Sequence, residues 1–266
     1  MNKKIVVLGE GYLGSAFKAR GYTVLGKDQL EILNYRDPDR TIHPILTMAL
    51  DKYDIIINCL AKSNTRYCEY HYHEALFANG TLPGILSYWC YLNHKKFVHV
   101  STGCLYDRND TPQKETDFLA AHCNYTLTKW IGEKNCMLGD LIIRPRLFFD
   151  GSNRLNNLLN KINKFDSLCG EMDSVTSTDV AVSAIEALLD NDCSGIFNVA
   201  CLGYTSMQEI GRLMGLYKPE ISIEEIRHQQ GLYLVNNIMD LHKLTQYYHP
   251  PFVVDEIKRC AKLLAK

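Results

Sequence analysis

The sequence predicts an α/β protein built on a doubly wound parallel sheet, with a smaller lobe towards the carboxyl terminus. Short apolar runs alternate with helical segments along the first 200 residues, and these runs are apolar throughout rather than at every second position. A glycine-rich turn joins the first run to the first helix. Fully apolar strands that alternate with helices are typical of a parallel sheet covered on both faces.

The strands are expected where short apolar runs end at turn residues. In chain order, they cover residues 4–8, 22–25, 53–60, 96–101, 140–144 and 196–200. The helices expected between them cover residues 11–20, 74–93 and 125–138. A further helix is expected over residues 177–189, with Thr178 or Asp179 near its start as the cap.

Composition excludes several classes of protein. The 266 residues are 46% hydrophobic and 22% charged, with 29 basic and 30 acidic residues, so bulk binding to nucleic acid or to an anionic membrane is not expected. No apolar run reaches about 18 residues, and the first one stops at Gly9, so neither a membrane span nor a signal peptide is predicted. We therefore expect a cytoplasmic protein.

The ten cysteines are interpreted as reduced thiols, most of them buried. No two of them have the C-x-x-C spacing of a zinc site. We therefore expect neither disulfides nor a bound metal.

The glycine-rich turn has the spacing that binds a dinucleotide. Gly9, Gly11 and Gly14, with Tyr12 and Leu13 among them, follow the first strand and open the first helix. Gly9 allows the tight turn, Gly11 lets a pyrophosphate approach the backbone, and Gly14 lets helix and strand pack closely. The amino terminus of the helix stabilises the phosphates. The sequence thus predicts a Rossmann-type nucleotide site.

The end of the second strand favours NADPH over NADH. An acidic residue at this position would select NAD by bonding the ribose hydroxyl. Here Lys27 offers a positive charge to a 2′-phosphate, although Asp28 follows it directly. NADP is the expected cofactor, and NAD stays possible.

A proton-transfer group is predicted from Tyr125 and Lys129, which lie four residues apart and so share one helix face. A nearby ammonium stabilises a phenolate, which makes a tyrosine a better acid and base near neutral pH. The lysine can also hold the nicotinamide ribose. The strand at 96–101 ends beside Thr102, whose hydroxyl would fix a carbonyl group at the carboxyl edge of the sheet.

From these features we divide the chain into two parts. Residues 1–150 form the dinucleotide-binding domain, to which the chain returns at about 175–200. Residues 151–174 and 201–266 form a substrate-binding lobe. The substrate is expected in the cleft between sheet and lobe, outside the carboxyl ends of the strands.

Together these residues resemble the extended short-chain dehydrogenase/reductase family over about residues 4–200. Besides the glycine turn and Thr102, Tyr125 and Lys129, the resemblance is carried by Asn58-Cys59-Leu60-Ala61, Asn79-Gly80-Thr81 and Arg144-Pro145-Arg146. Within the family, the chain is most similar to the sugar-nucleotide 4-keto reductases of rhamnose synthesis, to which Leu30–Asn34 adds a match. The resemblance implies that Cys59, Leu60 and Ala61 line the cofactor, that the substrate is a nucleotide sugar, and that a homodimer is possible.

Two residues add a resemblance to the bifunctional 3,5-epimerase/4-reductases that make nucleotide-linked L-rhamnose. Thr102-Gly103-Cys104 resembles their Thr-Gly-Cys, and residues 157–162 resemble the segment that carries their acid lysine. The resemblance implies that Cys104 is the epimerisation base and Lys161 its acid partner. A thiolate in this role needs a cationic neighbour.

Three functions stay open from the sequence. The leading hypothesis is an NADPH-dependent enzyme that epimerises C3 and C5 of a UDP- or dTDP-linked 4-keto-6-deoxyglucose and reduces C4. The second is a 4-keto reductase that depends on a separate epimerase. The third is a regulatory subunit that keeps fold and cofactor without catalysis; the intact set of Thr102, Tyr125 and Lys129 argues against it.

Overall fold

The computed structural model describes residues 3–26, 44–106 and 110–265, and for residues 44–46 the backbone alone. The chain forms two compact units, and it passes between them several times. Unit 1 comprises Met1–Ser101, Ala121–Ile143 and Cys193–Ile196. Unit 2 comprises Thr102–Ala120, Arg144–Asp192 and Phe197–Lys266.

A six-stranded sheet has the order β2-β1-β3-β4-β5-β9. Its strands are β1 (Ile5–Leu8), β2 (Thr23–Leu25), β3 (Ile55–Asn58), β4 (Lys96–Val100), β5 (Leu141–Pro145) and β9 (Gly195–Val199). The pairs β1/β2, β1/β3, β3/β4 and β4/β5 are parallel. This confirms the predicted α/β class with a parallel sheet.

The strand order reverses between β1 and β3, because the chain moves outward from β1 to β2 and returns to the other side of β1. In open α/β sheets, ligands bind outside the carboxyl ends of the strands at such a reversal. The glycine turn follows β1 and the Cys59 loop follows β3, so both lie at this point. The topology therefore places two predicted cofactor segments together within unit 1.

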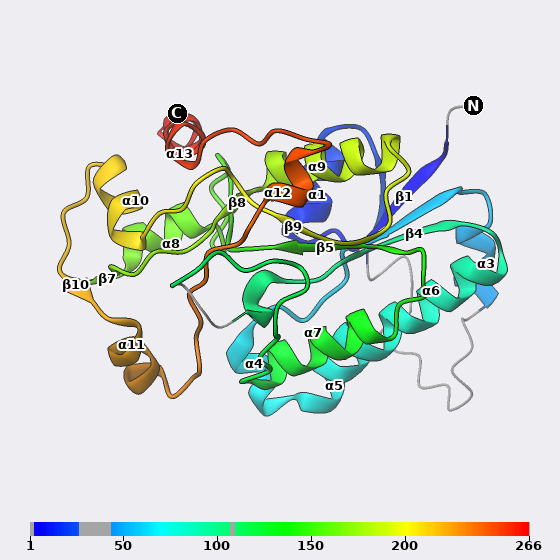
Figure 1. Cartoon of the computed structure of the whole chain (residues 1–266), viewed down its shortest axis with the longest axis horizontal. Helices are drawn as coiled ribbons and strands as arrows, with labels where there is room; N and C mark the ends of the chain where they lie inside the picture. Colours follow the sequence, from blue (N-terminus) through cyan, green and yellow to red (C-terminus); the bar gives the residue numbers. More distant parts are fainter. Residues whose placement is uncertain (1–2, 27–43, 107–109, 266) are drawn as a thin grey trace. The chain divides into compact units, whose positions relative to one another are not determined.

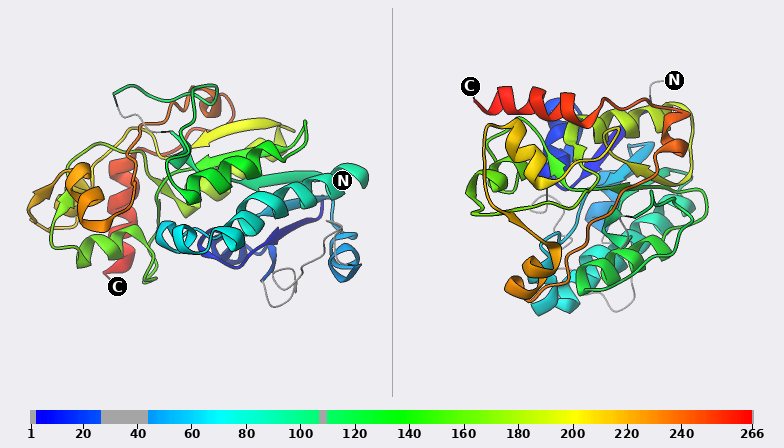
Figure 2. Two further views of the ribbon diagram at one scale, coloured as in Figure 1. Left: turned by 90° about the horizontal axis from the view of Figure 1, so that it is seen from below. Right: turned by 60° about the vertical axis from the view of Figure 1, so that its left-hand side comes forward.

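Helices cover both faces of the sheet in unit 1. Helix α1 (Tyr12–Ala19) lies on one face, and α6 (Leu82–Leu92) and α7 (Asn124–Lys134) lie on the other (Figures 1 and 2). One apolar cluster joins strands and helices; it contains Val6, Leu8, Leu50, Tyr53, Ile56, Leu60, Leu82, Leu86, Trp89, Cys90 and Phe97. The described part of unit 1 also contains three short helices: α3 (Pro44–Leu50), α4 (Thr65–Tyr70) and α5 (Tyr72–Leu76).

The long helix expected over residues 74–93 is interrupted. A single π-helical turn, η2 (Phe77–Thr81), lies between α5 and α6. Pro83 has no N–H group to offer the carbonyl of Asn79 four residues earlier, so regular α-helical bonding cannot continue there. Such bulges occur frequently at functional sites, and this one packs against α7.

Unit 2 combines two-residue strands with helices that range from 4 to 13 residues. It contains the 3-10 turn η3 (Gly103–Leu105), β6 (Phe148–Phe149), α8 (Leu158–Lys164), β7 (Leu168–Cys169), β8 (Thr176–Ser177), α9 (Thr178–Asp190), α10 (Met207–Leu213), β10 (Glu220–Ile221), α11 (Ile223–Gln230), α12 (His242–Thr245) and α13 (Val253–Leu264). Strands β6 and β8 pair in parallel, as do β7 and β10. Helix α10 packs on α8, β7 and α13 (Figure 2).

The start of α9 differs from the expected cap. Ser177, rather than Thr178 or Asp179, is the cap, and its Oγ accepts a hydrogen bond from the Val180 N–H at 3.1 Å. Asp179 instead forms an ion pair with Arg259 of α13. No helix in the described ranges is long and apolar enough to cross a membrane.

Candidate active site

The turn after β1 has the geometry that a bound pyrophosphate needs. Gly9 has a φ of +102°, and a Cβ at Gly9 would lie 3.0 Å from the Leu60 nitrogen. A Cβ at Gly14 would lie 1.8 Å from the Gly9 oxygen, so no side chain fits there. Gly11 is exposed, and a Cβ there would meet no protein atom within 4 Å. The glycine turn thus packs tightly against the protein at Gly9 and Gly14, and it leaves open space at Gly11.

A buried amide holds the loop after β3. Asn58 is fully buried, and its Oδ1 accepts a hydrogen bond from the Leu60 N–H at 3.1 Å. Its amide nitrogen lies 3.3 Å from Nδ1 of His99 on β4. Burial moves the pKa of His99 well below its usual 6.5, so the neutral ring accepts at Nδ1. The loop with Cys59, Leu60 and Ala61 is thereby fixed against the sheet.

Helix α7 carries the predicted proton-transfer pair. Its first turn is held by Glu69 of α4, whose carboxylate accepts a hydrogen bond from the Asn124 N–H at 2.7 Å. Tyr125 follows and is half-buried. Lys129, one turn further, is 1% exposed, and its Nζ donates to the Val100 carbonyl at 2.8 Å. Burial lowers the pKa of Lys129 from 10.5 to about 8, against the opposing effect of Glu133.

The π-helical turn is joined to α7 beside this lysine. Asn79 donates to the Thr128 hydroxyl at 3.1 Å, and its amide bonds both the N–H and the carbonyl of Lys62. A Cβ at Gly132 would lie 2.1 Å from the backbone carbonyl oxygen of Asn79. Gly132 therefore permits the close approach of α7, and Asn79 supports the Lys129 region through Thr128 and backbone bonds.

Thr102 begins unit 2 and directly follows Ser101, the first residue after β4. The Thr102 hydroxyl oxygen accepts a hydrogen bond from the Cys104 N–H at 3.1 Å, which caps η3. Because this bond uses the oxygen as acceptor, the hydroxyl proton is still available to a carbonyl group. Ser101 Oγ is buried and has no hydrogen-bond partner among the described residues. Two hydroxyl groups therefore follow β4 in succession.

The Cys104 thiol contacts a buried cation. The thiol is half-buried, and Nη1 of Arg146 donates to its sulfur at 2.9 Å. Arg146 also forms a two-point ion pair with Asp173, Nε to Oδ1 at 2.8 Å and Nη2 to Oδ2 at 2.6 Å. Sequence reasoning matched Arg146 to a family motif without assigning it to the site, and nothing in the spacing of Asp173 marks it.

Lys161 lies on α8, and the structure records no contact between it and Cys104. Its side chain is exposed and has no hydrogen bond or ion pair within the described parts of the chain. Partial burial nevertheless lowers the pKa of its amine. Lys27, Asp28 and Leu30–Asn34 lie outside the described residues.

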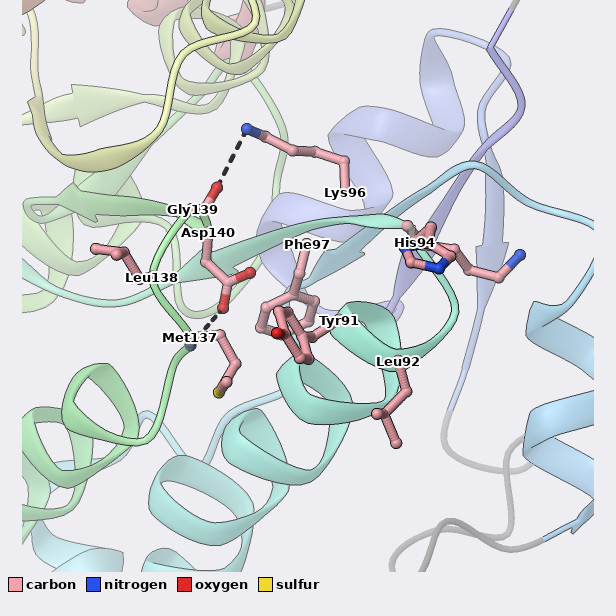
Figure 3. A pocket seen from close by; sticks show the side chains of 10 residues that line it. Tyr91, Leu92, His94, Lys96, Phe97, Met137, Leu138, Gly139 and Asp140 are labelled. Atoms are coloured by element: carbon pink, nitrogen blue, oxygen red, sulfur yellow. Dashed lines mark hydrogen bonds between the residues drawn. The ribbon is translucent and has the colours of Figure 1, made fainter.

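A hollow of about 390 Å³ in unit 1 is not this site (Figure 3). It lies where β4 begins, and His94, Lys96, Met137, Leu138 and Asp140 line part of it. Inside it, the Asp140 carboxylate accepts from the Met137 N–H at 2.8 Å, and Lys96 Nζ donates to the Gly139 carbonyl at 3.3 Å. The glycine turn and Thr102 follow the opposite, carboxyl ends of the strands.

Comparisons with known proteins identify a family and a fold that the chain shares. Residues 3–215 match the family described as the RmlD substrate binding domain. A probable low-salt glycan biosynthesis reductase of Haloferax volcanii is 28% identical over 226 residues, which are 76% of this chain and 75% of that protein.

Three solved structures illustrate the shared fold. A dTDP-4-dehydrorhamnose reductase of Clostridium acetobutylicum has a TM-score of 0.82 at 21% identity, covering 98% of this chain and 99% of that one. The UDP-rhamnose synthase of Acanthamoeba polyphaga mimivirus has a TM-score of 0.81 at 17% identity, covering 97% and 99%. A third, the dTDP-4-dehydrorhamnose reductase of Bacillus anthracis, was solved in complex with NADP and has a TM-score of 0.82 at 18% identity, covering 97% of this chain and 98% of that one.

Proposed function

The chain belongs to the RmlD substrate binding domain family, and hence to the sugar-nucleotide 4-keto reductases, and we propose that it is an NADPH-dependent 3,5-epimerase/4-reductase. Its substrate is a UDP- or dTDP-linked 4-keto-6-deoxyglucose, and its product is a nucleotide-linked L-rhamnose. The observation that carries the epimerase half is the Cys104 sulfur beside the Arg146 guanidinium. The reductase half depends on the buried amine of Lys129 one helical turn from Tyr125.

The reduction uses three side chains in defined roles. NADPH, when bound, supplies the hydride that adds to C4. Tyr125 donates the proton to the C4 oxygen, and Lys129 stabilises the phenolate that is left. The Thr102 hydroxyl donates a hydrogen bond to the same oxygen as negative charge develops on it.

The epimerisation needs a base and an acid, and no redox change. In this substrate, C3 and C5 flank the ketone, which acidifies their protons. The Cys104 thiolate removes a proton from one of these carbons, and the electron pair moves onto the ketone oxygen to form an enolate. Lys161 returns a proton to the carbon from the opposite side, which inverts it. The thiol then loses its proton to solvent and the Lys161 amine takes one up from solvent, which readies both groups for the second carbon.

The residues of the glycine turn fit a dinucleotide. Gly11 leaves the space through which a pyrophosphate approaches the backbone, and Gly14 keeps the helix close to β1. Tyr12 and Leu13 complete the turn, Cys59, Leu60 and Ala61 line the cofactor, and the Ser101 hydroxyl has hydrogen-bonding capacity to spare. We propose NADPH as the preferred form because Lys27, which follows the second strand in the sequence, offers a positive charge to a 2′-phosphate. The substrate lobe at 151–174 and 201–266 and a homodimer in the cytoplasm stay predictions.

A direct assay tests the proposal. The purified protein is mixed with NADPH and either UDP- or dTDP-4-keto-6-deoxyglucose, without any epimerase, and absorbance at 340 nm is followed. We expect NADPH oxidation and L-rhamnose as the sugar product. A reduced sugar with unchanged C3 and C5 would show reductase activity without epimerase activity. A monofunctional reductase is the second candidate because solved structures named dTDP-4-dehydrorhamnose reductase share the fold. No oxidation with any 4-keto sugar, including the pre-epimerised one, would favour the regulatory subunit.

A further inference from the structure

The Arg146 guanidinium donates hydrogen bonds to three partners: Asp173, Val235 and Cys104. Arg146 is 4% exposed and Asp173 is also 4% exposed, so the ion pair lies in the interior of unit 2. Asp173 takes the Nε and one Nη2 hydrogen, and the Val235 carbonyl accepts a second bond from Nη2. This leaves Nη1 directed at the Cys104 sulfur, 2.9 Å away.

The same framework holds the turn that carries the thiol. The side-chain amide of Asn237 is fully buried and donates to the Gly103 carbonyl at 3.0 Å, immediately before Cys104. The Asn237 backbone N–H donates to Asp173 Oδ1 at 3.3 Å. The Arg146 N–H in turn donates to the Thr176 hydroxyl at 2.9 Å. Sulfur and guanidinium are therefore fixed relative to each other by separate segments of unit 2.

We propose that Arg146, held by Asp173, is a positioning residue that keeps Cys104 as a thiolate and aims it at the substrate carbon. This inference rests on the proposed epimerisation, because a neutral thiol is a poor base for a C–H bond. Among the described residues, no other charged side chain is recorded in contact with the Cys104 sulfur. Because a guanidinium does not lose its proton in proteins, Arg146 cannot act as the acid of the reaction. That role is left to Lys161.

The reactivity of the thiol can be measured without substrate. Each thiol is alkylated with iodoacetamide at pH 7 and pH 9, and the rate at each cysteine is read by peptide mass spectrometry. The ratio of the two rates cancels accessibility. An ordinary thiol loses roughly 25-fold in rate over this interval. We expect Cys104 to lose less than about threefold. Cys123 is the internal control, since it is also half-buried but its sulfur lies 3.4 Å from a neutral hydroxyl.

Variants assign the effect to the guanidinium. In Arg146→Gln, the pH 7 rate at Cys104 should fall at least about tenfold, while Cys123 is unchanged. Because this variant leaves the buried Asp173 charge without a partner, the double variant Arg146→Gln/Asp173→Asn, which buries no charge, is measured beside it. Arg146→Lys keeps a cation and should retain most of the wild-type rate. A wild-type Cys104 that slows as much as Cys123 between pH 9 and pH 7 would overturn the inference with no variant needed.

Deuterium exchange separates this inference from the proposed function. We expect the Arg146→Gln/Asp173→Asn variant to lose exchange at C3 and C5 in D2O at least tenfold, and to lose much less of its rate of reducing the pre-epimerised 4-keto sugar. If Cys104→Ala abolishes exchange but the double variant exchanges normally, Arg146 has no such role and the epimerase stands. If the wild-type protein catalyses no deuterium exchange at C3 and C5, the proposed epimerase activity is wrong. The alkylation ratios then decide by themselves whether Arg146 maintains a thiolate at Cys104.

Discussion

Replacing the buried lysine should make the protein more stable and inactive at the same time. Lys129 has its pKa lowered from 10.5 to about 8 because the amine is removed from water. The difference between these values corresponds to about 3 kcal/mol that folding loses when the amine is charged. Lys129→Met removes this term together with one hydrogen bond to Val100, worth about 1 kcal/mol. The variant should therefore be more stable at pH 7 by about 2 kcal/mol.

The sign of the pH dependence follows from proton binding. Between about pH 8 and 10.5, the unfolded chain carries a proton on Lys129 that the folded chain has released, so wild-type stability rises with pH relative to the variant. Below pH 8 the full penalty is present. The gain in stability from Lys129→Met should thus be greatest at pH 7, shrink from pH 8 upward and change sign by about pH 10. The total change in this stability difference should be up to about 3 kcal/mol.

The assay is urea denaturation followed by circular dichroism, at pH values from 7 to 10. Lys134→Met is the matched control, because Lys134 lies on the same helix but is exposed, and it should change stability by less than about 0.5 kcal/mol at each pH. Of the two variants, only Lys129→Met should lose reduction of the 4-keto sugar. A Lys129→Met protein that is less stable at pH 7, by an amount that does not vary with pH, would refute this account of the buried amine.

The remaining predictions concern the other parts of the site. Tyr125→Phe should abolish reduction while NADPH binding, measured by fluorescence titration, changes less than about threefold; retained turnover would remove Tyr125 from the mechanism. Cys104→Ala should stop deuterium exchange at C3 and C5 but spare reduction of the pre-epimerised sugar; persistent exchange would show that the base is elsewhere. Gly11→Ala should leave the melting temperature unchanged yet weaken NADPH binding at least tenfold, because the added Cβ meets only open space in the protein. Gly14→Ala should destabilise the fold by about 1–3 kcal/mol or more, since its Cβ would lie 1.8 Å from the Gly9 oxygen, and equal melting temperatures for the two variants would contradict that reading of the turn.

The sheet and the glycine turn could be predicted because local sequence determines them. Fully apolar runs specify buried parallel strands, and each predicted strand of unit 1 that the structure describes is present, with ends that differ by one or two residues. The π-helical turn was not predicted because residues 74–93, rich in apolar side chains on both sides of Asn79-Gly80-Thr81, were interpreted as one helix. Pro83 inside that pattern was the available signal, since proline removes a helical N–H.

The surroundings of Cys104 could not be predicted from spacing. Arg146, Asp173 and Asn237 come from separate segments, and their meeting depends on the packing of unit 2 rather than on a local pattern. A thiolate at Cys104 needs a cation beside it, but the sequence pattern identified no residue for that position and gave Lys161 only as the acid partner. In the structure the cation beside the Cys104 sulfur is Arg146. The sequence pattern had assigned it only to the Arg144-Pro145-Arg146 motif at the end of β5.

The isotopic pattern of the product tests the central claim most directly. The protein, unlabelled NADPH and UDP- or dTDP-4-keto-6-deoxyglucose are combined in D2O, and the product is analysed by NMR. The account predicts L-rhamnose with deuterium at C3 and C5 and protium at C4, because the first two positions exchange through Cys104 and Lys161 while C4 receives its hydrogen from the cofactor. A C4-reduced sugar that retains protium at both C3 and C5 would contradict the bifunctional mechanism, and failure to reduce even the pre-epimerised 4-keto sugar would contradict the role of Tyr125 and Lys129.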